Sequence, residues 1–229
     1  GYLLVTVQLP DSASVERTAK VMREIETQAS AIPGIHHVTA ISGESFATGA
    51  AGSNFGSMFV GFDSYEERRD PNRWSGAIVE QLAAHGVDLS LTTNGSTLAT
   101  TAVDLRSAGL DRLNISLDSL RPERFEELTR RDELPAVLAG IRAAVAAGFD
   151  PVKVNVVVVR GVNDDEIVDF ARFGRDEGVT VRFIEFMPLD ADNRWSHGQV
   201  MPSAEIVAAI DAVFPTEPVH RGSDPAERH

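Results

Sequence analysis

The sequence of 229 residues contains no cysteine. A chain without cysteine cannot build a disulfide framework, a thiolate metal site or a cysteine nucleophile. Long apolar runs are also absent, because every such run falls far short of the roughly 20 residues that a membrane helix needs. No signal-peptide pattern opens the chain. We therefore expect a soluble protein without membrane insertion, and we assign it no metal site and no catalytic residue.

Positive charge is scarce as well. The chain has 21 Lys and Arg residues against 34 Asp and Glu residues, a formal net charge of -13. This balance argues against nucleic acid or an anionic membrane as a partner. The 43% of hydrophobic residues and 24% of charged residues are typical of a globular protein. A chain of this length can bury one sizeable core or two small ones.

Residues 1–85 show the order β-α-β-β. Tyr2–Gln8 is predicted to be a strand, and the apolar residues of Val15–Ile25 recur at helical spacing. Ile35–Ser42 and Ser57–Phe62 are predicted to be two further strands, with a glycine-rich loop between them. With a helix over Gly76–His85, this order predicts an N-terminal ferredoxin-like unit.

From residue 86 onward, strand and helix patterns alternate strictly. The predicted strands are Val87–Leu91, Arg112–Leu117, Val152–Val159 and Val179–Phe186, and the predicted helices are Ser96–Ala108, Pro122–Arg130, Leu134–Ala147, Asp164–Glu177 and Ser203–Val213. Alternation of this kind implies a parallel sheet with right-handed crossovers. About four β-α units are too few for a closed TIM-type barrel.

The predicted fold is therefore α/β. A ferredoxin-like β-α-β-β unit in residues 1–85 is joined to a partial TIM-type β/α barrel in residues 86–214, and residues 215–229 form a flexible tail. The ferredoxin-like pattern requires a last strand where Val87–Leu91 arrives, so we expect that strand to be shared by both parts.

Polar residues recur inside the otherwise apolar strands of the second part. Asn114, Ser116 and Asp118 share one side of their strand, and Lys153 and Asn155 share one side of the next. Ligands of parallel α/β folds bind beyond the carboxyl ends of the strands, so this pattern predicts a ligand site there. The alternative is that these polar side chains satisfy one another inside the sheet.

Four segments of this part resemble successive barrel segments of the GTP 3',8-cyclase family. They are "LTTNGSTL", "AGLDRLNISLDSL", "FDPVKVNVVVVRGVNDDEI" and "VTVRFIEFMPLD". This family of cytoplasmic radical S-adenosylmethionine (SAM) lyases begins molybdenum cofactor synthesis. The resemblance covers about Gly86 to Ile210, and it implies SAM as cofactor and GTP as substrate.

The same resemblance implies roles for individual residues. Ser116 and Met187 would contact SAM, and Thr92 and Lys153 would contact GTP, while further candidates for the site are Asn155, Arg182 and Glu185. The chemistry of these side chains agrees, since a lysine ammonium suits a triphosphate and a methionine thioether offers a soft apolar wall.

The chain also departs from this family. Such enzymes hold two [4Fe-4S] clusters on cysteines, and no cysteine is present here. Protein side chains cannot replace the electron that a cluster supplies to SAM. We therefore expect a fragment derived from a cyclase that performs no radical chemistry.

The N-terminal part resembles a different family. "GYLLVTVQLPDSASVERTAKVMREIE", "ISGESFATGAAGSNFGSMFV" and "YEERRDP" are similar to a periplasmic porter subdomain of resistance-nodulation-division (RND) efflux transporters, over about Gly1 to Ala84. This resemblance implies that Phe46 lies on a drug-contacting switch loop. The alternative is that Gly43–Gly56 is an ordinary flexible connection. The two resemblances together predict a chimera, joined near Ala84 to Gly86.

Three hypotheses about function follow. The chain is an enzyme fragment that keeps part of a pocket for GTP and SAM, a drug-contacting transport module, or a recombinant of both without inherited activity. We also interpret Asn163, with Glu166 three residues later, as a helix cap whose acidic first turn suits the helix dipole.

Overall fold

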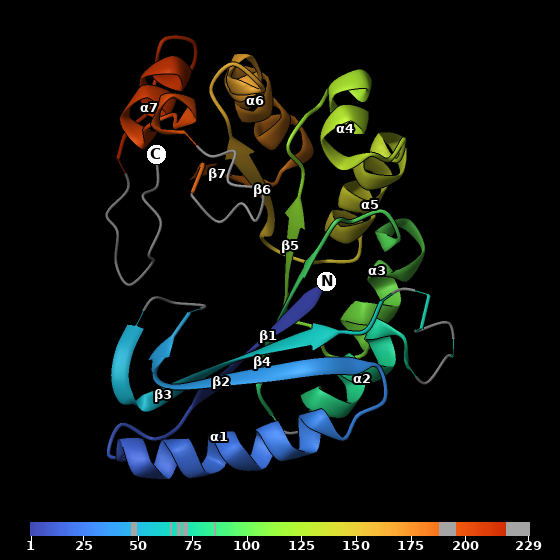
Figure 1. Cartoon of the computed structure of the whole chain (residues 1–229), viewed down its shortest axis with the longest axis vertical. Helices are drawn as coiled ribbons and strands as arrows, with labels where there is room; N and C mark the ends of the chain where they lie inside the picture. Colours follow the sequence, from blue (N-terminus) through green and yellow to red (C-terminus); the bar gives the residue numbers. More distant parts are fainter. Residues whose placement is uncertain are drawn as a thin grey trace.

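A computed structural model of the chain describes residues 1–46, 50–64, 66–67, 70, 73–84, 86–187 and 196–218. Within these residues, seven strands form one sheet in the order β2-β3-β1-β4-β5-β6-β7 (Figure 1). The strands are β1 (Tyr2–Gln8), β2 (Ile35–Ser45), β3 (Ala50–Phe62), β4 (Asp88–Thr93), β5 (Arg112–Ser116), β6 (Val152–Val158) and β7 (Thr180–Glu185). The α/β class predicted from the sequence is confirmed.

Seven α-helices accompany these strands in the described part of the chain. They are α1 (Val15–Ser30), α2 (Ser75–Ala83), α3 (Leu98–Ser107), α4 (Pro122–Thr129), α5 (Leu134–Ala146), α6 (Ile167–Glu177) and α7 (Ser203–Asp211), with short 3-10 helices η2 (Asp164–Glu166) and η3 (His197–Gln199). Local signals set several of their ends. The Ser14 hydroxyl accepts the Arg17 N–H at 3.4 Å and caps α1, while α6 ends where Gly178 adopts a left-handed conformation (φ 69°).

The N-terminal half of the sheet is antiparallel. Strand β1 pairs with β3 on one side and with β4 on the other, and β3 pairs with β2. The chain order β1-α1-β2-β3-α2-β4 with this strand order is that of a ferredoxin-like fold. The predicted ferredoxin-like arrangement is confirmed, and β4 supplies its last strand.

The C-terminal half of the sheet is parallel. Strands β4, β5, β6 and β7 pair in sequence order, and the opposite edge of β4 is taken by β1. The prediction that the strand near Val87–Leu91 is shared by both parts is therefore confirmed. Among the described residues the parallel half is a partial barrel that does not close, since β7 lies at the end of the sheet.

The two faces of the sheet differ in composition. Along β1, Leu3, Val5 and Val7 are buried on the side of α1, whereas Tyr2, on the other side, is partly exposed. Figure 1 shows α1 beneath the N-terminal strands and α3 to α6 along the outer side of the parallel strands. The opposite face, which carries Tyr2 and continues across β4 to β7, is called the open face below.

The glycine-rich stretch predicted as a loop is instead part of a β-hairpin. Strand β2 runs three residues past Ser42, and β3 begins seven residues before Ser57. The glycines allow close packing and a bulge. A side chain at Gly56 would lie 2.5 Å from the Met22 sulfur, and the register shifts at Gly43, whose φ is +102°. Glycine concealed the strand pattern because it carries no side chain from which to read alternation.

Two predicted helix boundaries also need correction. The helix predicted from Ser96 begins at Leu98, because Asn94 and Gly95 form a turn in which the Asn94 side chain accepts the Ser96 N–H at 3.3 Å. The helix predicted over Asp164–Glu177 is divided into the 3-10 turn η2 and helix α6. Of the predicted tail, residues 219–229 lie outside the described residues.

Candidate functional site

A first row of polar side chains crosses three parallel strands on the open face. The register aligns Thr92 of β4 with Asn114 of β5, and Asn114 with Lys153 of β6. Residues aligned in this way project to the same face, and neighbouring strands lie about 4.8 Å apart. The Asn114 amide donates to the hydroxyl of buried Ser90 at 2.9 Å. The two residues predicted to contact GTP, Thr92 and Lys153, therefore share one row.

A second row follows two residues further along the strands, about 6.6 Å away. The register aligns Ser116 with Asn155, and Asn155 with Arg182. Ser116 is exposed, and Asn155 and Arg182 are partly buried. The side-chain oxygen of Asn155 is buried and accepts no hydrogen bond from the described residues. A buried acceptor without a donor is uncommon, and it is a place where a ligand N–H or O–H can bind.

Three predicted site residues lie outside the two rows. Glu185 is aligned with Val158, whose side chain is buried in the core, and a Glu185 carboxylate oxygen accepts the Ser203 N–H at 2.6 Å at the start of α7. Met187 lies two residues beyond β7, with 51% of its surface exposed. Phe46 follows β2 on the N-terminal hairpin. The structure therefore brings Thr92, Lys153, Ser116, Asn155 and Arg182 together and leaves these three apart.

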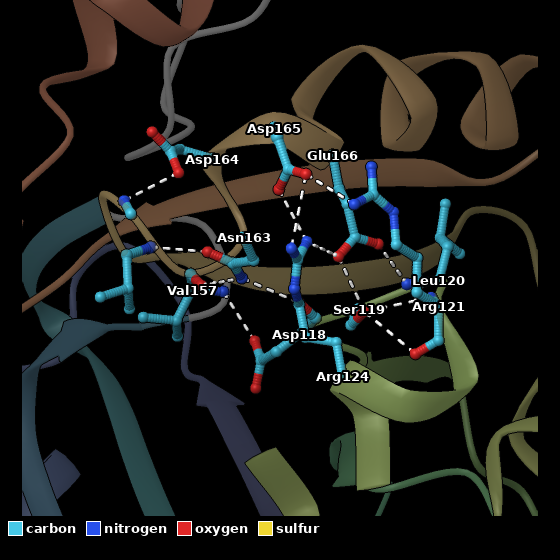
Figure 2. A network of polar contacts seen from close by, with 12 residues as sticks. Asp118, Ser119, Leu120, Arg121, Arg124, Val157, Asn163, Asp164, Asp165 and Glu166 are labelled. Atoms are coloured by element: carbon cyan, nitrogen blue, oxygen red, sulfur yellow. Dashed lines mark hydrogen bonds and ion pairs between the residues drawn. The ribbon is translucent and has the colours of Figure 1, made fainter. Parts of the chain in front are cut away.

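A network of polar contacts fixes the ends of β5 and β6, and Figure 2 shows it from close by. The Asp118 carboxylate accepts the Val157 N–H at 2.8 Å. The Asn163 side chain accepts the Val159 N–H at 2.8 Å and donates to the carbonyls of Asp118 and Val157 at 2.8 and 2.9 Å. Together with Glu166, described next, these contacts are called the strand-exit network.

Asn163 lies at the N-cap position that the sequence predicted, ahead of η2 and its acidic first turn, but the predicted capping contact is missing. Its side chain makes no capping bond to η2, and it points instead toward the strand ends in Figure 2. Asn163 is almost fully buried, and all three of its contacts hold backbone groups at or just beyond the ends of β5 and β6. Those groups require partners once they are buried, which explains why an amide occupies this position.

Glu166 is the other buried centre of the strand-exit network. It has no exposed surface, and its carboxylate accepts the Ser119 hydroxyl at 2.8 Å and the Leu120 N–H at 2.7 Å. The Arg124 guanidinium pairs with the same carboxylate. A fully buried carboxylate is tolerated where donors and an opposite charge surround it in this way. Glu166 therefore ties the segment that follows β5 to the segment that follows β6.

The outer part of the network is more exposed. Asp165 accepts from both Arg121 and Arg124 at 2.6 Å, with about half of its side chain exposed. Hydrogen bonds from Arg124 and Arg121 lower the pKa of the Asp165 carboxyl. Burial acts in the opposite direction at Asp118, where loss of water raises the pKa of the carboxyl although the Val157 N–H partly opposes this shift.

The strand-exit network was missed in the sequence because its partners are distant in the chain. Ser119 and Glu166 are 47 residues apart, and Asp118 and Asn163 are 45 residues apart. The available signal was the placement of polar residues directly after two apolar strands, which is where parallel strands end at a common edge. Within the ranges that the structure describes, no group of three His, Asp or Glu side chains is arranged to hold a metal ion.

Comparison with known families assigns the chain to a class. The sequence matches the Radical SAM superfamily over residues 10–174. A match over this share of the chain, on an α/β fold with a partial parallel barrel, shows that the chain belongs to the radical SAM superfamily.

The curated relatives are GTP 3',8-cyclases. The chain is 55% identical to that of Geobacter sulfurreducens over 135 residues, which are 59% of this chain and 41% of the relative. It is 50% identical to that of Moorella thermoacetica over 143 residues, 62% of this chain and 44% of the relative. The mitochondrial GTP 3',8-cyclase of Arabidopsis thaliana is 49% identical over 129 residues, 56% and 33% of the two chains. The predicted resemblance to cyclases is confirmed.

The chain spans about two fifths of the length of these relatives. Among solved structures, one titled "Structure of TYW1 with a lysine-pyruvate adduct bound" aligns with a TM-score of 0.49 at 14% identity, over 63% of this chain and 47% of the other.

The residues of the site fit one cofactor of the superfamily and not the other. A [4Fe-4S] cluster does not fit this chain, because cluster iron is held by cysteine thiolates and the sequence has none. SAM fits the second row better. Ser116, Asn155 and Arg182 offer a hydroxyl, an amide and a guanidinium, which suit the polar ends of an amino-acid nucleoside.

Within the described residues, no helix is both long and apolar enough to cross a membrane.

Proposed function

We propose that the chain is a cyclase-derived fragment whose two polar rows keep part of a binding surface for GTP and SAM. The observation that supports this proposal is the alignment of five predicted ligand residues on one face of the four parallel strands β4 to β7. Thr92 and Lys153 contact GTP, and Ser116 contacts SAM together with Met187. Asn155 offers its buried acceptor to either ligand. The location of such a fragment is the cytoplasm, as for the cyclase family that it resembles.

Binding of GTP to this surface is weak. A barrel enzyme contacts its ligand from many strand ends, and the described part of this chain has four parallel strands. Each lost hydrogen bond to a charged group costs about 1.5 to 3 kcal/mol, so a few such losses move a micromolar ligand into the millimolar range. The net charge of -13 also repels a triphosphate, and Lys153 and Arg182 are the cations of the two rows that oppose it.

The decisive experiment uses the two lysines of the chain, Lys20 and Lys153. We expect titration calorimetry to show GTP binding in the millimolar range that Lys153→Ala weakens by about tenfold, the loss of one charged contact. Lys20→Ala removes the same charge from the exposed surface of α1 and serves as the matched control. Binding that both variants weaken equally would reflect net charge alone and would contradict the proposal.

We further propose that the chain alone performs no radical chemistry. Without thiolates it holds no cluster to reduce SAM, whereas its relatives are named as cyclases of GTP. The test is incubation of the purified chain with iron, sulfide, dithionite and SAM under anaerobic conditions. We expect no 5'-deoxyadenosine above a control without protein, and production of this nucleoside in stoichiometric or greater amount would refute the proposal.

A second candidate function concerns the N-terminal unit, which we propose as a domain of residues 1–85, distinct from the cyclase-derived residues 86–214. The observation that favours an RND porter origin is Phe46, which is 39% exposed at the tip of a long hairpin. In this proposal Phe46 contacts apolar drugs, as a switch-loop residue would. Binding of a hydrophobic dye that Phe46→Ala leaves unchanged would argue for the third hypothesis, a recombinant without inherited activity.

A further inference from the structure

Three aromatic rings lie together on the open face of the N-terminal strands. The Phe59 ring lies 6.0 Å from the Tyr2 ring and 5.4 Å from the Phe46 ring, measured between centroids, with interplanar angles of 53° and 55°. Tyr2 is 40% exposed and Phe46 is 39% exposed. These three residues are called the aromatic cluster. Tyr2 and Phe46 expose ring surface to solvent, and both rings pack against Phe59.

The aromatic cluster is held in place by a buried hydroxyl. The Phe46 N–H donates to the Ser57 hydroxyl at 2.9 Å, and this hydroxyl donates to the Glu44 carbonyl at 3.1 Å. Ser57 is fully buried, so it holds the end of β2 over β3 without competition from water. The position of Phe46 next to Phe59 is therefore fixed by backbone contacts as well as by ring packing.

The aromatic cluster continues directly into the first polar row. The register aligns Tyr2 of β1 with Thr92, and the row then passes through Asn114 to Lys153. All four side chains project to the open face, because aligned residues of neighbouring strands share a face. Three strand spacings separate Tyr2 from Lys153, about 14 Å. An aromatic surface and an ammonium group thus lie at the two ends of one row.

We infer that the aromatic cluster and the first row form one binding surface for a nucleoside triphosphate, with the base on the ring of Tyr2 and the phosphates at Lys153. This inference rests on the proposed function, since it assigns to the same GTP a contact in the N-terminal unit. Bases stack on aromatic side chains because both have polarisable π faces. Thr92 and Asn114, between the two ends, offer hydrogen bonds to the ribose.

The base and the phosphates can be tested separately by titrating the full chain with GTP, with guanosine and with inorganic triphosphate. Base stacking on an aromatic side chain is usually worth about a tenfold change in affinity, so we expect GTP to bind about tenfold more tightly than inorganic triphosphate. Tyr2→Ala removes this advantage and leaves the binding of inorganic triphosphate unchanged. Lys153→Ala weakens both phosphate ligands and leaves the weak binding of guanosine unchanged.

Two control variants separate a lost contact from a damaged fold. Tyr2→Phe keeps the ring and should keep the preference for GTP. Val103→Ala removes another exposed apolar side chain, 66% exposed on α3, and should change none of the affinities. If Tyr2→Ala lowers the thermal unfolding temperature markedly, Phe46→Ala serves in its place, because Phe46 packs against Phe59, the ring that supports Tyr2.

The outcomes also distinguish this inference from the proposed function. GTP binding that depends on Lys153 and is indifferent to both Tyr2→Ala and Phe46→Ala would overturn the inference and leave the proposed function standing. Guanosine binding as tightly as GTP would overturn the assignment of the phosphates to Lys153. Absence of GTP binding, or binding indifferent to Lys153→Ala, would overturn both.

Discussion

The polar rows cross the parallel strands and the strand-exit network joins the segments that follow β5 and β6, and the two differ in how well their polar atoms are satisfied. In the network, Asn163 and Glu166 are buried and each makes three contacts with protein groups. In the rows, Asn155 has a buried oxygen that accepts nothing from the described residues. The same kind of residue thus has two different environments within a few residues of sequence.

This difference separates structural polar residues from candidate ligand residues. A buried polar group that is fully paired stabilises the fold. Its removal leaves its partners buried without a hydrogen bond, which lowers the free energy of unfolding. A buried group without a partner lowers stability, and such a group is explained where a ligand supplies the missing contact. The comparison therefore predicts that substitutions in the strand-exit network lower the free energy of unfolding, whereas replacement of Asn155 in the second row raises it.

The largest effect is expected for Glu166→Ala. This substitution leaves Arg124, Ser119 and the Leu120 N–H without their common acceptor, and breaking a buried ion pair from one side costs about 3 to 5 kcal/mol. Urea unfolding followed by circular dichroism measures the loss. Asp165→Ala, which removes a half-exposed partner of the same arginine, should cost about 1 kcal/mol or less. Equal losses for both variants would contradict a central role for Glu166.

Asn163→Ala should have the next largest effect. It leaves the Val159 N–H and two carbonyls at the strand ends without a partner, and a buried unsatisfied group costs about 1 to 3 kcal/mol. We expect a loss of about 3 kcal/mol in the free energy of unfolding. Asn163→Asp keeps the acceptor for Val159 and loses the donor, so hydrogen exchange at Val159 should remain slower in it than in Asn163→Ala.

Asn155→Leu should change stability in the opposite direction. It replaces a buried oxygen without a partner by apolar atoms of similar volume, which we expect to raise the free energy of unfolding by about 1 kcal/mol. The same chemical denaturation experiment measures the gain. Destabilisation by 2 kcal/mol or more would show that Asn155 belongs with the structural residues of the network.

The smallest expected effect is a change in how the free energy of unfolding depends on pH when Asp118 is replaced. Its folded-state pKa is raised by burial, so the folded protein retains a proton to higher pH than the unfolded chain, whose Asp pKa is about 3.9. The free energy of unfolding therefore falls as pH rises from about 3.9 through the folded-state pKa. Asp118→Asn removes this fall and gains stability relative to the parent across that window.

Asp165→Asn provides the control of opposite sign for Asp118→Asn. The pKa of Asp165 is lowered in the folded state by Arg124 and Arg121, so its contribution to stability is present above the unfolded-state value and is lost as pH falls. Denaturation midpoints measured from pH 3 to pH 7 compare the two variants. Parallel pH profiles for them would contradict the assigned pKa directions.

The sequence allowed the parallel half of the sheet to be predicted closely. Strands such as β6 are rich in valine and bounded by turns, and their alternation with helices along the chain predicts a parallel sheet. The two rows could also be predicted, since alternation alone places Lys153 and Asn155 on one face. The shared role of β4 followed from the strand that a ferredoxin-like unit still lacked.

Two features could not be predicted from local patterns. The hairpin of β2 and β3 was hidden because Gly43, Gly52 and Gly56 leave no side-chain alternation to read. The strand-exit network was hidden because Asn163 and Glu166 have the spacing of a helix cap, while the partners of Glu166 and the Asp118 carbonyl that Asn163 contacts lie more than 40 residues away. In both cases contacts between segments that are distant in the sequence determine the structure, and the local sequence pattern predicts a different one.

The antiparallel pairing of β1 with β4 limits how the sheet can grow. A barrel closes when its first and last strands pair with each other. Here one edge of β4 pairs with β5, and the backbone groups on its other edge, which another parallel strand would need, already bond to β1. An added parallel strand can therefore extend this half of the sheet at β7, while closure around the two rows requires β1 to be displaced first. The N-terminal unit thus acts as a competitor of any segment that would restore the barrel.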